Sequence, residues 1–479
     1  MKSESGSGIE LRWIGGLAAL CVLAYIPAWI AFFVKDDLAL ISSARLAPGA
    51  VWFHTWPGGF FRPIAELLFA VEYWSFGFHP LPYHLVSWVA HLGSAFFVYR
   101  LFNLLAPLRA VSFFAAALFA LHPLNTETVS WISGQMSLFA SLCTLIVLYI
   151  LGMGRRWGAL ISVFVLGLGF YENFLLVLLL WGVLCLFDDR FRSLVRPVPL
   201  LVLGLCSGGY LYWRFGVLGL GGGYYQASFS IKTALVNMAY YLYLLVGGSA
   251  VGGRIIRYRL EDLGSHFFTV FTPLFLVNTL LLIGCFYIVV RSRSRPKFKT
   301  LLPALWIFVA LLPTVLLPER PRRLAYLAVP GFALVMGQVL CYVREKICFA
   351  PWVAKVVIAV YALVLSSTLY LRNLDWYAVG SLERSFPEVV RDECRQRIFD
   401  MPNLVGDALF FNSISTAQWM RLNGENADSQ VFAPFEWKDR QRQIRAECYY
   451  RYDDGLIRPV REVPPRPIFS RGRNWADTP

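Results

Sequence analysis

The chain is poor in charge and lacks the common motifs of nucleotide enzymes and hydrolases. Only 15% of its 479 residues are charged, whereas soluble domains carry about 25%. It contains no GxGxxG or GxxxxGKS/T phosphate loop, no GxSxG nucleophile turn and no HExxH zinc motif. Nucleotide-driven chemistry is therefore not expected. Because 57% of the residues are hydrophobic, most of the chain is predicted to face lipid.

The positive charge is not arranged for nucleic acid. The net charge is +14, but lysines and arginines form short blocks between apolar stretches, with no basic stripe among stacking aromatic residues. Such blocks are typical of the cytoplasmic loops of membrane proteins. We therefore predict an integral membrane protein that binds no nucleic acid.

Eleven apolar stretches have the length and composition expected of transmembrane helices. They predict an all-α fold of about eleven spans, and the length of the first stretch favours a retained helix over a cleaved signal peptide. With the N-terminus in the cytoplasm, the basic blocks fall on alternate, cytoplasmic loops. The predicted spans are 13–34, 83–102, 109–126, 131–151, 157–170, 172–187, 197–218, 267–290, 300–317, 324–343 and 350–371.

This topology divides the chain in two. Residues 1–371 form the predicted membrane domain, and residues 372–479 form a small extracytoplasmic C-terminal domain. The apolar segment 231–246 is predicted to be an interfacial helix on the outer side, since another crossing there would misplace the next basic block. Cys394 and Cys448 then lie on the oxidising side as a candidate disulfide. A free pair of buried thiols is the alternative.

Two adjacent carboxylates mark the outer end of the first predicted span. Asp36 and Asp37 follow it directly. An acidic pair at the mouth of a span is costly unless water, a cation or a reacting hydroxyl meets it, so a catalytic role is predicted for both. The alternative is a surface loop, 35–91, whose charges are solvated and whose tryptophans form an interfacial belt.

Other polar residues interrupt the apolar pattern on the same predicted face. Arginines there run against the usual charge bias, so each needs a partner, and a phosphate suits the guanidinium group. His122 can instead be bonded to backbone at a helix end. Glu127 and Glu172 can be structural carboxylates, and the arginines of 254–259 can bind lipid headgroups nonspecifically. These polar residues are His122, Asn125, Glu127, Glu172, Arg214, Arg254, Arg257, Arg259, Glu319, Arg320, Arg322 and Arg323.

Five segments, in this order, carry a family resemblance. They are DDLALI, FFRPIAELLFAVEYWSFGFHPLPYHLVSWVAHL, ALFALHPLNTETVSWISGQ, YENFLLVLLL and RRLAYLAVPGF. Together they resemble the membrane core of the GT-C glycosyltransferases, and most of all the tetratricopeptide-containing O-mannosyltransferases and their bacterial relatives. The chain departs from that pattern at Tyr171, where the family has Lys, and at Arg322, where it has Glu. Residues 135–137 replace an Arg-acidic element of the family.

The resemblance implies inverting transfer of a sugar from a polyprenyl-phosphate donor to a protein, lipid or glycan hydroxyl. The reaction would take place at the outer face of a bacterial inner membrane. Asp36 would act as general base, with Asp37 orienting the acceptor or sharing the proton. Arg323 would hold the leaving phosphate, with Arg62 and Arg214 as further candidates. The remaining substrate-binding candidates are His122, Glu127, Glu172 and Tyr326.

No cofactor is expected, although Asp36, Asp37 and Glu127 could hold a divalent ion through oxygen ligands. Two other functions compete with transfer. A polytopic transporter or lipid flippase would suit eleven spans, but no pair of broken helices in matching halves is visible. A catalytically lapsed relative that only binds a lipid-linked sugar would suit the departures named above.

Overall fold

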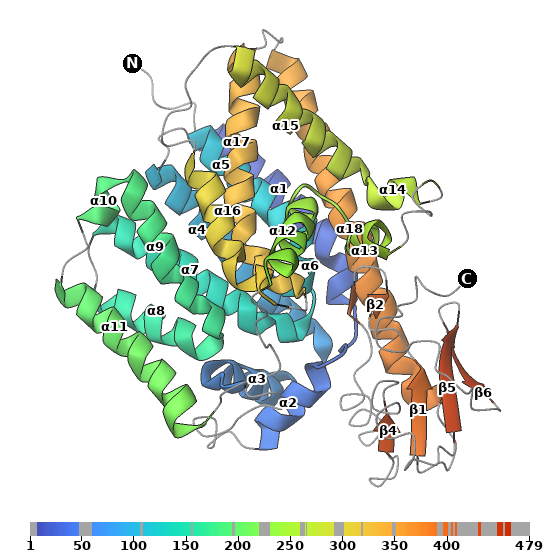
Figure 1. Ribbon diagram of the computed structural model, residues 1–479. Coiled ribbons are helices and arrows are strands. Elements are labelled where there is room, and N and C mark those ends of the chain that lie inside the picture. Colours follow the sequence, from blue (N-terminus) through green and yellow to red (C-terminus); the bar gives the residue numbers. More distant parts are fainter. Residues whose placement is uncertain are drawn as a thin grey trace.

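The computed structural model shows a chain that is almost entirely helical (Figure 1). The residues that the structure describes are 7–46, 60–105, 109–154, 157–193, 197–219, 230–258, 264, 266–291, 301–317, 320–346, 351–389, 396–400, 404–405, 408–409, 430–432, 448–453 and 456–460.

In the first half of the chain, apolar runs form helices that end at polar or proline-containing turns. These α-helices are α1 (Ser7–Trp29), α2 (Asp37–Leu46), α3 (Pro63–Phe76), α4 (Pro80–Leu105), α5 (Arg109–Leu121), α6 (Thr126–Val129), α7 (Gln135–Met153), α8 (Trp157–Phe170) and α9 (Leu176–Phe187). Short 3-10 helices join some of them, namely η1 (Pro123–Asn125), η2 (Ile132–Gly134) and η3 (Glu172–Leu175).

The second half continues in the same manner. Its α-helices are α10 (Asp189–Arg192), α11 (Pro197–Tyr212), α12 (Ile231–Leu245), α13 (Ala250–Tyr258), α14 (Phe267–Val270), α15 (Pro273–Arg291), α16 (Leu302–Val315), α17 (Val329–Lys346) and α18 (Pro351–Val389). A π-helical segment, η4 (Trp213–Val217), extends α11, and the 3-10 helix η7 (Arg322–Ala328) leads into α17.

Several helices have the dimensions of membrane spans. Those long and apolar enough to cross a bilayer, five within the described residues, are Pro80–Leu105, Ile132–Met153, Leu200–Val217, Arg322–Leu340 and Val356–Phe386. Shorter apolar helices accompany them, and each predicted span overlaps a helix of the structure. Large apolar side chains such as Leu205 and Leu371 are exposed, as expected where a surface faces lipid. An integral membrane architecture is therefore supported, while the count of eleven spans and their orientation stay predictions.

The last long helix, α18, packs against the first helix, α1, and holds it in place. α18 packs along α1, and α5 packs along α17. A Cβ atom at Gly380 would lie 2.5 Å from the backbone nitrogen of Phe32, so only glycine lets α18 approach the chain there. The buried amide of Asn373 donates to Ala24 O at 2.7 Å and accepts from Ser130 Oγ at 2.6 Å. These contacts hold the end of α1, and thus the chain leading to Asp36, against the rest of the bundle.

The C-terminal region corrects the all-α prediction. Four strands form a mixed sheet in the order β4–β1–β5–β6, in which β1 is parallel to β4 and β5, and β5 is antiparallel to β6. β2 and β3 form a separate antiparallel pair. The strands, which carry isolated aromatic and β-branched residues among polar ones, are β1 (Gln396–Asp400), β2 (Leu404–Val405), β3 (Ala408–Leu409), β4 (Gln430–Phe432), β5 (Cys448–Asp453) and β6 (Leu456–Val460).

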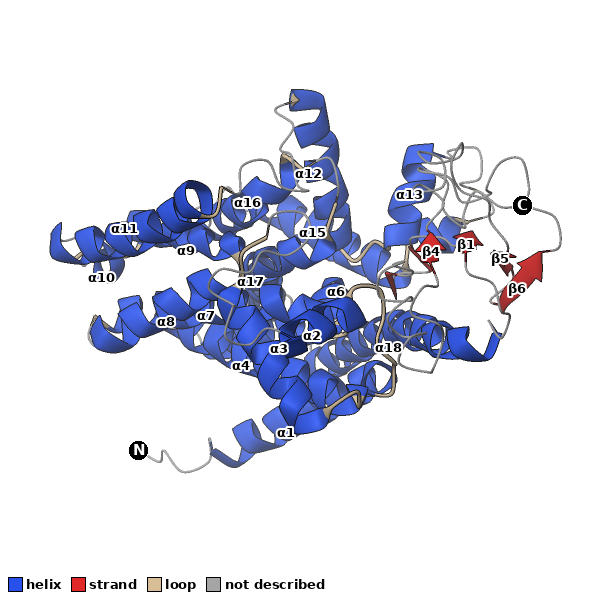
Figure 2. Cartoon of the chain, turned by 90° about the horizontal axis from the view of Figure 1, so that it is seen from below, coloured by secondary structure: helices blue, strands red, loops and turns tan. Residues whose placement is uncertain are grey.

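The sheet lies beside the C-terminal part of α18 and away from α8 to α11 (Figures 1 and 2). α18 runs unbroken to Val389, well past residue 371, where its span was predicted to end. The helix therefore belongs to both predicted parts of the chain. The division into a membrane domain and an extracytoplasmic domain stays a prediction. So does the interfacial position of residues 231–246, although the predicted helix is present as α12.

Candidate functional site

The acid pair lies at the start of α2, where the two carboxyl groups have different surroundings. Asp37 is buried, with 1% of its surface exposed. Its Oδ2 accepts from the backbone nitrogen of Val34 at 2.9 Å, and its Oδ1 accepts from the backbone nitrogen of Ser133 at 2.8 Å and from the Ser133 hydroxyl. Asp36 is half-buried. Asp37 thus holds the turn together, and Asp36 is the member of the pair that solvent or a substrate can reach.

Burial dominates the electrostatics of Asp37. Removal from water raises its pKa from 3.8 to about 7, although the hydrogen bonds from Ser133 and Val34 favour the charged form. The neighbouring charge of Asp36 adds to the increase. A carboxyl group with such a pKa can share or exchange a proton near neutral pH.

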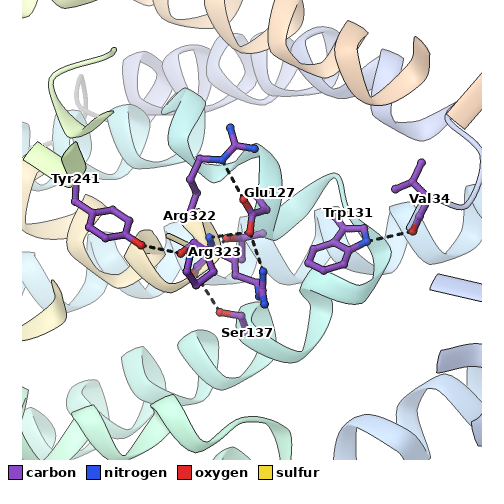
Figure 3. Close-up of polar contacts among 9 residues, drawn as sticks. Val34, Glu127, Trp131, Ser137, Tyr241, Arg322 and Arg323 are labelled. Atoms are coloured by element: carbon purple, nitrogen blue, oxygen red, sulfur yellow. Dashed lines mark hydrogen bonds and ion pairs between the residues drawn. The ribbon is translucent and has the colours of Figure 1, made fainter. Parts of the chain in front are cut away.

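A second cluster joins Glu127 to two arginines of η7 (Figure 3). Glu127 Oε2 accepts from Arg322 Nε at 3.0 Å, and Oε1 accepts from Arg323 Nη1 at 2.9 Å. Burial opposes the charge of Glu127, but the two guanidinium groups outweigh it and hold the pKa of Glu127 below its ordinary value. We call these three residues the Glu127 cluster. It carries one net positive charge, and Arg323 is its more accessible arginine, with a side chain 13% exposed against 5% for Arg322.

The loop between α5 and α7 folds so that it can bring these groups together. His122 precedes Pro123, which disfavours a continuing helix, and α5 ends there. Gly134 is required where the loop doubles back, because a Cβ atom there would lie 2.6 Å from the carbonyl oxygen of Glu127. Trp131 joins the Glu127 cluster to the turn before the acid pair, because its Nε1 donates to Val34 O at 3.3 Å and its ring centre lies 5.1 Å from the Arg323 guanidinium carbon.

A third group, the Glu172 cluster, consists of Arg62, Glu172 and Arg214. Arg62 binds Glu172 through two hydrogen bonds of 3.1 Å, and Arg214 Nη2 lies 3.7 Å from Glu172 Oε1. The Arg62 guanidinium carbon is 3.9 Å from the ring centre of Tyr171 and 4.3 Å from that of Phe60. Tyr171, a departure from the family pattern, therefore supplies a stacking surface for Arg62. This cluster also carries one net positive charge, and Glu172 is its most exposed member at 28%.

The first turn of α7 and the residues just before it connect all three groups. Ser133 binds Asp37. Met136 Sδ accepts from Arg62 Nη1 at 3.5 Å, and Ser137 Oγ donates to the backbone oxygen of Arg323 at 3.2 Å. Residues 133–137 thus form a common support, and we name them the α7 entry segment.

Two predicted substrate-binding residues, His122 and Tyr326, are buried and bonded to other parts of the protein. His122 is fully buried, its Nε2 lies 2.9 Å from Leu245 O, and its Nδ1 accepts from the backbone nitrogen of Leu124 at 3.2 Å. These are the contacts described by the backbone-bonded alternative. Tyr326 is 1% exposed, and its hydroxyl lies 2.7 Å from His91 Nδ1. Neither side chain reaches the surface of the site in this conformation.

Some functional candidates of the sequence fall outside the described residues. Arg259, Glu319 and Cys394 are among them, as are the side chains of Arg254, Arg257 and Cys448. Within the part of the chain that is described, no group of three or more His, Cys, Asp and Glu side chains is placed to hold a metal ion. Sequence reasoning missed Trp131 and Ser133. Ser133, a polar residue inside the predicted span 131–151, was their only signal.

No family model matches the chain, and the curated relatives match part of it. Protein O-mannosyl-transferase Tmtc1 of Drosophila melanogaster is 30% identical over 176 residues, 33% of this chain and 20% of the relative. Human protein O-mannosyl-transferase TMTC4 is 28% identical over 159 residues, 27% of this chain and 21% of the relative. The chain covers about a fifth of the length of these relatives. The predicted resemblance to O-mannosyltransferases is confirmed for the part of the chain that these relatives match.

Solved structures also include a similar protein. ArnT from Cupriavidus metallidurans in the apo state aligns with a TM-score of 0.49 and 11% sequence identity. The alignment covers 93% of this chain and 94% of ArnT.

Proposed function

We propose that the chain is a membrane glycosyltransferase that moves a sugar from a polyprenyl-phosphate donor to an acceptor hydroxyl at the extracytoplasmic face, with inversion. One observation carries the proposal: an acid pair and two arginine clusters converge on the α7 entry segment. The partial similarity to proteins named O-mannosyltransferases supports it and makes protein one candidate acceptor, beside lipid and glycan.

The charges of the site suit a phosphate leaving group. Each arginine cluster brings two guanidinium groups and one carboxylate together, and guanidinium groups bind phosphate oxygens well. A phosphate can enter such a cluster through charge-assisted hydrogen bonds without displacing the carboxylate that positions the arginines. We assign the phosphate to Arg323, and Arg62 and Arg214 are the second candidates.

The reaction needs one base and one anion site. The acceptor hydroxyl loses its proton to Asp36 as its oxygen forms a bond to the anomeric carbon. The bond from that carbon to the phosphate oxygen breaks at the same time, and the polyprenyl phosphate leaves with the electron pair toward Arg323. Asp36 suits the base role because it is the more accessible member of the pair, whereas Asp37 is buried.

Arg323→Ala should weaken donor binding by about 10- to 100-fold, because a charge-assisted phosphate contact contributes about 1.5–3 kcal/mol. Binding of a polyprenyl-phosphate sugar to the purified chain measures this, with acceptor KM determined in parallel. Arg190→Ala is the control, since Arg190 pairs with Asp188 at the end of α9 and should not affect binding. A change confined to the acceptor KM would remove Arg323 from the phosphate role.

Transfer from polyprenyl-phosphate sugars by the purified chain in detergent tests the proposal as a whole. Formation of a product with the opposite anomeric configuration to the donor is expected.

A further inference from the structure

Two buried side chains beside the site each leave one oxygen without a partner. Glu72 of α3 is 2% exposed and Gln135, the first residue of α7, is fully buried. Gln135 Nε2 donates to Glu72 Oε1 at 3.0 Å and to the backbone oxygen of Tyr83 at 3.0 Å. Both amide hydrogens are then used. Among the residues that the structure describes, Glu72 Oε2 and Gln135 Oε1 have no hydrogen-bond partner.

An unpartnered carboxylate oxygen in this position is costly, because a buried acceptor without a donor loses its hydration without compensation. Glu72 has no ion pair with a described lysine or arginine. Each of the two unpartnered oxygens exposes less than 1 Å², so a water molecule has no room to contact them. A proton needs no such room.

We propose that Glu72 is a protonated carboxylic acid that forms a cyclic acid–amide pair with Gln135. In this pair the amide donates to Glu72 Oε1, and the acid hydrogen on Oε2 is donated back to Gln135 Oε1. One proton thereby satisfies both unpartnered oxygens. The inference concerns groups to which the proposed transfer reaction gives no role, although its effect on turnover rests on that proposed function.

The surroundings of Glu72 favour the neutral form. Burial raises its pKa from 4.5 to about 8, and the hydrogen bond from Gln135 reduces the increase only in part. Tyr83 is the titratable group that faces Glu72 from α4, and Gln135 faces it from α7. α8 carries no charged residue, and Asp37 of α2 is bonded to Ser133.

The pair of Glu72 and Gln135 fixes the middle of the α7 entry segment to α3. Ser133, two residues before Gln135, binds Asp37, and Met136 directly after it contacts Arg62. Ionisation of Glu72 would remove one of the two hydrogen bonds of the pair and bury a negative charge there. We therefore assign Glu72 and Gln135 as positioning residues that hold the acid pair and the arginine clusters in register only while the proton is present.

Glu72→Gln tests the proposed pair, because the amide of the variant can donate to Gln135 Oε1 at every pH. Infrared spectra of the purified chain in detergent are recorded for wild type and variant. The difference should contain the carbonyl band of a protonated acid below pH 8 and lose it above, following the pKa of about 8. Glu66→Gln, which changes a second buried acid of the same helix, is the matched control and should leave that band in place. A band that persists in Glu72→Gln and vanishes in Glu66→Gln overturns the assignment.

Stability and turnover give two further readings. The folded pKa of Glu72 lies above the unfolded value of 4.5, so the stability of wild type should fall as pH rises between 4.5 and about 8. Glu72→Gln should lessen that fall. Its turnover number should also stay constant where the wild-type value declines on the alkaline side. An unchanged pH dependence of both quantities in Glu72→Gln contradicts the pair. If the chain shows no transferase activity, the infrared and stability results still test whether Glu72 is protonated and paired with Gln135.

Discussion

Replacing Asp36 with Asn should lower the rate of sugar transfer by about 10²- to 10⁴-fold, the usual contribution of a general base, while donor binding persists. Asn keeps the size of the side chain and can hydrogen-bond, but it cannot accept the hydroxyl proton. Single-turnover transfer with saturating donor measures the effect on the chemical step, and a separate binding assay shows whether the donor site is intact.

Asp37→Asn is the matched comparison, because the neighbouring carboxylate has a different environment. Asn at this position would turn an amide hydrogen toward either the Val34 nitrogen or Ser133, which are both donors. The variant should therefore lower the melting temperature as well as the rate, whereas Asp36→Asn should lower the rate alone. Transfer by Asp36→Asn at the wild-type rate would remove Asp36 from the mechanism.

The second large effect concerns Glu127. Glu127→Gln leaves the guanidinium groups of Arg322 and Arg323 in a buried site without their carboxylate, and losing one partner of a buried ion pair costs about 3–5 kcal/mol. A strong fall in melting temperature in detergent is expected. Glu172→Gln is the control of the same type: Glu172 is 28% exposed against 2% for Glu127, so water can replace part of what is lost.

The pH dependence of stability gives a second test of Glu127. Because its folded pKa is depressed, Glu127 contributes stability above its unfolded pKa of 4.5, and that contribution is lost as pH falls through the folded value. Glu127→Gln should lack this acid-side loss. Equal melting temperatures for Glu127→Gln and Glu172→Gln would show that burial of the Glu127 cluster does not determine how much the cluster contributes to stability.

The helices could be predicted from the sequence because their signal is local. Apolar runs of sufficient length predict spans wherever they occur, and every predicted run contains a helix. The last span was predicted to end at residue 371 because hydropathy falls at Arg372, while the helix itself continues to Val389. The strands beyond residue 396 were missed, since they are two to six residues long and have no clear alternation.

The contacts of the site join residues that are far apart in the sequence, and they could be predicted only in part. A carboxylate pair after the first span is visible in the sequence, but its Ser133 partner lies 96 residues away. Arg62 and Glu172 are 110 residues apart. The residue types indicated acids, phosphate-binding arginines and a polar loop. Which arginine meets which acid depends on how α3, α7 and η7 pack, and a single sequence contains no such information.

The proposed transfer reaction is tested by incubating the purified chain with a panel of polyprenyl-phosphate sugars and a set of protein, lipid and glycan acceptors. At least one donor should yield a product of inverted anomeric configuration, and Asp36→Asn should bind this donor without forming the product. Donor binding without transfer from any member of the panel would contradict the account and support a lapsed relative. Movement of the intact lipid-linked sugar across vesicle membranes, with no product, would contradict it in favour of a flippase.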